Sequence, residues 1–171
     1  MSKRLLALCI LLIVVIGMVS TTAAQEGAVV VVEPGDTVML GMGTTLTMEG
    51  MAPFGIDIRR GVEIALMDRP TVTVDGVEFE LGLDVQDSAC LAEGGQPVAN
   101  RFVSDESIVG VIGHMCTPST MAAIPIYDEA GYTIISASAT NPMLTLSGYT
   151  RFNRTVVGDT LQRSEERRVG K

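Results

Sequence analysis

The chain has 171 residues, a length that predicts one domain, and its apolar share of 47% is ordinary for a globular protein. It is acidic, because 12 Lys and Arg oppose 20 Asp and Glu, and its formal net charge is −8. This balance argues against a nucleic-acid-binding protein, since contacts to phosphate groups require Lys and Arg.

The first 24 residues have the pattern of a secretory signal peptide. A basic start is followed by an uninterrupted apolar run over residues 5–19 and by small residues before Gln25. A membrane anchor, the alternative, needs about 20 apolar residues. We therefore expect residues 1–24 to be removed on export to the periplasm, and residues 25–36 to form a lead-in segment.

The next part of the chain predicts a strand, a helix and a hairpin. Residues 37–44 form a short apolar run typical of a buried strand, and residues 54–68 have a helical pattern. The inward face of that helix is expected to comprise Ile58, Val62, Ala65 and Leu66. Residues 71–85 alternate around Asp75-Gly76, which predicts a β-hairpin.

A loop over residues 86–95 and a helix over residues 96–104 are expected to follow, with Pro97 in the first helical turn. The residues of this helix that should face inward are Val98, Phe102 and Val103. Residues 108–113 predict another strand. The hydroxyl of Thr117 is expected to cap a helix that runs to Glu129 and ends at Gly131. The last expected elements are a strand over 132–136, a loop over 138–141, a helical turn over 142–146 and a strand over 152–157.

Strands and helices alternate along this chain, which predicts an α/β fold with a parallel sheet flanked by helices on both faces. In such sheets ligands bind at the carboxyl ends of the strands. The loops after Thr44, Gly113 and Ser136 are therefore the places where a site is expected.

Loss of the signal peptide would leave two of the three cysteines, Cys90 and Cys116. A pair of cysteines in an oxidising compartment is typical of a disulfide. Two buried free thiols are the alternative.

His114 and Cys116 raise the possibility of a hydrolase, because residues two apart on a strand point to the same side. A cysteine nucleophile must be a free thiolate, however, and Cys116 has a candidate partner. A zinc site needs three or four ligands, and the chain has a single histidine. We therefore expect no catalytic residue, no metal and no cofactor.

A binding site is the remaining interpretation. Thr117 is expected where a strand ends and a helix begins, so free backbone N–H groups and the helix dipole would favour an anion. The turn Ser138-Ala139-Thr140 would add hydroxyls and more backbone donors on the next strand. The two turns could hold the charged head group of an amino acid. Alternatively, these residues only cap helices.

Four segments, over residues 54–66, 83–90, 109–120 and 126–156, resemble the substrate-binding proteins of ABC importers for leucine, isoleucine and valine. The resemblance implies a bilobal receptor of the periplasmic-binding-protein type I fold, of which residues 37–162 would form part of the N-terminal lobe. It further implies a monomeric, non-catalytic protein that binds a branched-chain or related amino acid. Its partner would be an ABC permease in the inner membrane.

The resemblance also implies roles for particular residues. Cys90 and Cys116 would form a disulfide, while Met115, Cys116 and Thr117 would line the cleft, with the Thr117 hydroxyl bonded to the head group. The second binding turn would be Ser138, Ala139 and Thr140, and Phe54 would pack on the ligand side chain at the cleft mouth.

The chain also departs from the family. Residues 44–53 form a longer loop than expected, residues 92–95 look like an insertion, and Ala137 stands where Pro is common. We expect the chain to be a truncated fragment. Residues 163–171 form an atypical charged tail, which we expect to be non-native. A ligand-sensing domain of a signalling receptor and a receptor for amides or urea are the alternative functions.

Overall fold

The computed structural model describes residues 30–169 of the chain, and the predicted signal peptide lies outside these residues. The strands are β1 (Thr37–Thr44), β2 (Thr71–Val74), β3 (Val77–Asp87), β4 (Ile108–Gly113), β5 (Ile134–Ser136) and β6 (Phe152–Arg154). The helices are α2 (Ala52–Asp68), α3 (Ala92–Val103), α4 (Thr117–Ala130), α5 (Met143–Leu146) and α6 (Asp159–Val169). No helix among residues 30–169 combines the length and apolar character needed to span a membrane.

The strands form one sheet in the order β2-β3-β1-β4-β5-β6, in which only β2 and β3 are antiparallel to each other. The predicted mostly parallel α/β fold is therefore confirmed. The β2–β3 hairpin turns at Asp75 and Gly76, whose φ angles of 50° and 83° are those a type I′ turn requires. β3 then continues two residues beyond the predicted end.

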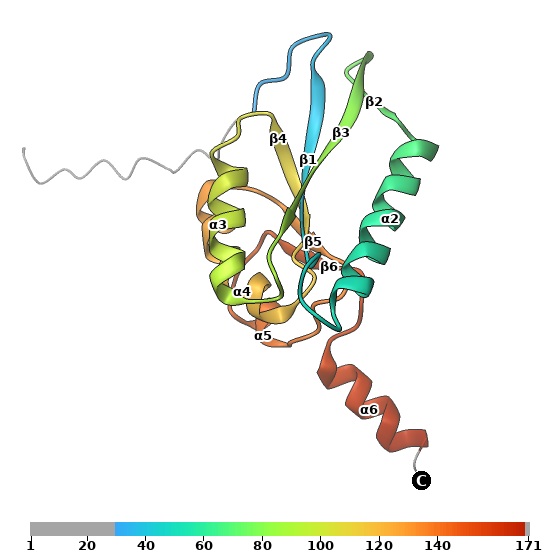
Figure 1. The fold of residues 1–171 in the computed structure, drawn as a ribbon, viewed down its shortest axis with the longest axis vertical. Helices are drawn as coiled ribbons and strands as arrows, with labels where there is room; N and C mark the ends of the chain where they lie inside the picture. Colours follow the sequence, from blue (N-terminus) through green and yellow to red (C-terminus); the bar gives the residue numbers. More distant parts are fainter. Residues whose placement is uncertain (1–29, 170–171) are drawn as a thin grey trace, which may run out of the picture.

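Helices lie against both faces of the sheet (Figure 1). Gly41 of β1 faces α3, because a Cβ added there would lie 2.9 Å from the ring of Phe102. Thr44 points to the opposite face, where its hydroxyl donates to the Gly55 carbonyl of α2 over 3.2 Å. The main core lies on the side of α3 and α4 and includes Val98, Phe102, Ile108, Val111, Ile124, Tyr127 and Ile134.

The opposite face is covered less completely. Of the four residues predicted to face inward from α2, Ile58, Val62 and Leu66 are half-buried and Ala65 is exposed. The prediction was wrong for Ala65 because α2 has no neighbouring helix on this face within the described residues, so only a narrow stripe of it touches the sheet. Ile135 of β5 also remains 43% exposed.

Helix α3 begins at Ala92, four residues before the predicted start, so residues 92–95 form its first turn and not a loop. Pro97 consequently lies inside the helix, which corrects its predicted place in the first turn. Gly94 and Gly95 allow this early start, because added Cβ atoms there would overlap the carbonyl oxygens of Ser88 and Ser119.

The C-terminal elements also differ from prediction. Strand β5 begins two residues later than expected, and β6 stops at Arg154. Part of the predicted charged tail, residues 163–169, belongs to α6, which projects away from the sheet (Figure 1).

Candidate functional site

A cleft of 580 Å³ opens at the carboxyl ends of β4 and β5, beside the first turns of α2. Five of the seven residues expected to bind ligand line it, namely Phe54, Met115, Cys116, Thr117 and Ser138. Ala139 is buried and Thr140 half-buried, and neither is among the lining residues. The prediction missed four lining residues, Met51, Asp57, Ile58 and Pro118.

The first turn of the site joins β4 to α4. Cys116 is the N-cap residue and Thr117 the first helical residue, so the prediction that the Thr117 hydroxyl caps the helix was wrong. The first intrahelical bond runs from the Thr120 N–H to the Cys116 carbonyl over 3.0 Å. The N–H groups of Cys116, Thr117 and Ser119 precede this bond and have no acceptor within the helix, and Pro118 has no N–H, so three donors remain at the positive end of α4.

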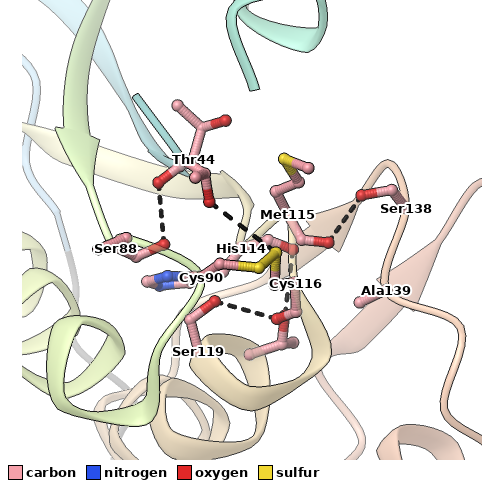
Figure 2. The surroundings of a disulfide bond; sticks show 12 residues. Thr44, Ser88, Cys90, His114, Met115, Cys116, Ser119, Ser138 and Ala139 are labelled. Carbon is pink, nitrogen blue, oxygen red and sulfur yellow. Dashed lines mark hydrogen bonds between the residues drawn. A yellow bond between two sulfur atoms is a disulfide. The ribbon is translucent and has the colours of Figure 1, made fainter. Parts of the chain in front are cut away.

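Serine hydroxyls connect this turn to the one after β5. The Ser138 hydroxyl donates to the Met115 carbonyl over 2.7 Å, as Figure 2 shows, and the Ser136 hydroxyl donates to the His114 carbonyl over 2.7 Å. Ser136 also accepts the Ala139 N–H over 3.1 Å. The hydroxyl proton of Ser138 therefore bonds the Met115 carbonyl and is not available to a ligand. The oxygen of the same hydroxyl lines the cleft and can still accept a hydrogen bond.

The backbone of residues 139–141 is oriented from outside the cleft. The Thr140 carbonyl accepts the N–H of Asp159 over 3.0 Å, and the Ala139 and Asn141 carbonyls accept the guanidinium of Arg154. The peptide bonds here are trans, so each N–H points away from the preceding carbonyl. The N–H groups of Thr140 and Asn141 therefore point away from Arg154 and α6, and neither has an acceptor among the described residues.

His114 lies beneath the first turn and is fully buried. Its Nε2 lies 3.0 Å from the hydroxyl of Tyr127, and its Nδ1 has no partner within the described part of the chain. Burial lowers the pKa of His114 to about 4, so the ring is neutral at pH 7. His114 is not among the residues that line the cleft.

Cys90 and Cys116 form a disulfide with their Cα atoms 5.1 Å apart, which confirms the predicted pair and leaves no free thiol on Cys116 (Figure 2). The disulfide attaches the β3–α3 loop to the N-cap of α4. Ala89 and Cys90 both have positive φ angles, 48° and 59°, which L-residues rarely adopt.

Asp87, at the end of β3, holds the loop that leads from β1 to α2. Its carboxylate accepts the N–H groups of Leu46 and Ala89 and the hydroxyl of Thr47. Burial opposes ionisation of Asp87, but these hydrogen bonds outweigh it and keep its pKa below the ordinary value. The loop over residues 44–53 is thereby fixed at the edge of the cleft.

No family model matches the chain. It is 45% identical over 87 residues to the leucine-specific-binding protein of Salmonella typhimurium, a match that covers 51% of this chain and 21% of the relative. It is 38% identical over 89 residues to the leucine-, isoleucine-, valine-, threonine- and alanine-binding protein of Pseudomonas aeruginosa, covering 52% of this chain and 23% of that protein. The chain thus spans less than a quarter of the length of these two relatives.

Solved structures show the same fold. The leucine-binding protein LivK of Thermotoga maritima superposes with a TM-score of 0.66 at 25% identity, over 74% of this chain and 34% of that one. LivJ of Streptococcus pneumoniae, solved with isoleucine, gives a TM-score of 0.63 at 21% identity, over 72% and 35% of the two chains. Over the part that it spans, the chain is related in sequence and in fold to the leucine/isoleucine/valine-binding proteins of ABC importers.

Proposed function

We propose that the chain is part of an extracytoplasmic receptor that binds a branched-chain or related amino acid for an ABC permease and has no catalytic activity of its own. The observation that carries this proposal is the cleft where Thr117 and Ser138 meet, with unpaired backbone N–H groups on the turns that flank it. In this proposal residues 37–162 belong to one lobe, and export depends on the signal peptide of residues 1–24.

The head group of the amino acid would be held by the two turns. The N–H and hydroxyl of Thr117 would donate to the carboxylate at the positive end of α4, and the N–H and hydroxyl of Thr140 would donate from the second turn. Each hydrogen bond to a charged group contributes about 1.5–3 kcal/mol. The oxygen of Ser138 would accept from the ammonium.

The wall beside this head-group site is apolar and suits an aliphatic side chain. It comprises Met51, Phe54, Ile58 and Met115. Phe54 is 61% exposed, so a ligand side chain could remove part of its ring from water. The thioethers of Met51 and Met115 adapt to ligands of different shape. Urea and small amides would leave this wall uncovered, which favours an amino acid over them.

A substitution at Thr117 tests the head-group site. We expect Thr117→Val to weaken leucine binding to the full chain about tenfold, because it removes one hydrogen bond of about 1.5 kcal/mol to a charged group. Calorimetry at high protein concentration would measure the weak binding expected of a single lobe. Thr133→Val, on an exposed residue before β5, is the matched control and should leave binding unchanged. Equal affinity of Thr117→Val and the unsubstituted chain for leucine would contradict the proposal.

A further inference from the structure

Arg154, the last residue of β6, donates hydrogen bonds to the turn that follows β5 and to helix α5. Its Nη1 donates to the Asn141 carbonyl over 3.0 Å and to the Ala139 carbonyl over 3.5 Å, while Nη2 donates to the Thr145 hydroxyl over 3.3 Å. The backbone of Gly158 also packs against the guanidinium, since an added Cβ would lie 2.6 Å from Nη2. Arg154 is half-buried.

This guanidinium has no carboxylate partner among the described residues, whose arginine ion pairs are Arg59–Glu63, Arg60–Asp57 and Arg101–Asp84. The two arms of the guanidinium hold different groups: Nη1 donates to the two carbonyls and Nη2 to the Thr145 hydroxyl, a planar arrangement that a lysine ammonium does not reproduce. The pair of contacts to Ala139 and Asn141 therefore determines how the intervening peptide units are turned.

The orientation of these peptide units decides where their N–H groups point. Because the Ala139 carbonyl faces Arg154 and the Thr140 carbonyl faces the N–H of Asp159, the N–H groups of Thr140 and Asn141 are directed to the opposite side. The positive charge of Arg154 lies behind the same turn and raises the electrostatic potential on it. Both effects favour an anion in front of the turn.

We propose that Arg154 is a positioning residue for recognition of the ligand carboxylate: it holds the 139–141 turn so that the Thr140 N–H can donate to a carboxylate at the edge of the cleft, beside Ser138. The identity of the ligand in this inference rests on the proposed function. The orientation of the 139–141 turn does not, because it is a property of the protein without ligand. A merely structural role would instead tie β6 to α5 and affect every ligand equally.

The test compares Arg154→Gln, Arg154→Lys and the control Arg151→Gln, which removes an exposed arginine of the preceding loop. Leucine and leucinamide are the probes, because only leucine carries a carboxylate. We expect Arg154→Gln and Arg154→Lys to weaken leucine binding about fivefold to tenfold and to leave leucinamide binding within twofold. Lysine keeps the positive charge but not the planar set of donors. If Arg154→Lys binds leucine as tightly as the unsubstituted chain, the positioning role is overturned. A parallel loss for both probes would also overturn it.

A second readout needs no ligand. Residual dipolar couplings report the direction of each backbone N–H, and we expect Arg154→Gln to change those of Thr140 and Asn141 while the couplings of β4 and α4 stay the same. Unchanged couplings at Thr140 and Asn141 would overturn the inference. If neither probe binds the unsubstituted chain while these couplings change as expected, the proposed function fails and the positioning of the turn stands.

Discussion

Removal of the Cys90–Cys116 disulfide is expected to lower the free energy of unfolding by about 3–4 kcal/mol, the chain-entropy value for a loop of this length. The two cysteines are 26 residues apart in sequence, and their bond joins the β3–α3 loop to the start of α4. Without it, Ala89 and Cys90 are free to leave their positive φ angles, and the N-cap of α4 loses its attachment.

Urea denaturation of the double variant Cys90→Ala/Cys116→Ala measures this effect. Both chains should carry Cys9→Ser, so that no third thiol can exchange with the pair. A reductant should destabilise the parent by the same amount and leave the double variant unchanged. A difference below about 1 kcal/mol would show that the loop and α4 are held by their other contacts.

Acid is expected to begin to destabilise the protein near pH 6.5, above the pH range in which carboxylates titrate. His114 has a pKa of about 4 in the folded chain and about 6.5 when unfolded, because burial opposes its charged form. The unfolded state therefore binds a proton first. The full stability is present above pH 6.5 and is lost progressively as the pH falls toward 4, by about 3 kcal/mol in total.

Denaturation measured at a series of pH values checks this expectation, with His114→Gln as the comparison. Glutamine can still hydrogen-bond the Tyr127 hydroxyl but does not titrate. His114 is the only histidine of the chain, so the loss between pH 6.5 and 4 should disappear in the variant. Loss below pH 4 should persist, because the lowered pKa of Asp87 makes its own contribution there. If the free energy of unfolding falls equally steeply between pH 6.5 and 4 in both proteins, His114 is not the source of the loss.

The sequence predicted those features whose cause is local. The predicted bounds of β1 and β4 were correct because each strand is a compact apolar run. The β2–β3 turn was predicted correctly because Asp75-Gly76 suits two positive φ angles. The start of α3 was missed because Gly94 and Gly95 look like loop residues in sequence. In the fold they are first-turn residues whose missing side chains make room for neighbouring backbone.

The candidate site was predicted in part for the same reason. Thr117 and Ser138 follow apolar strands, so their place at the carboxyl edge of the sheet could be expected from chain order. The hydrogen bond from the Ser138 hydroxyl to the Met115 carbonyl depends on how two loops approach each other. No local sequence pattern predicts such a contact. The contacts of Arg154 with Asn141 arise in the same way, since they join segments that only the sheet brings together.

The most direct test is to follow the backbone amide signals of the full chain by NMR while leucine is added. If the two turns bind the head group, the largest saturable shifts will occur at the N–H groups of Thr117, Thr140 and Asn141. Leucinamide will shift the signals of Thr117 and Thr140 less than leucine does. Saturable shifts that leave these amides unmoved and gather elsewhere, such as along Val38 and Leu40 of β1, would contradict this account of the site.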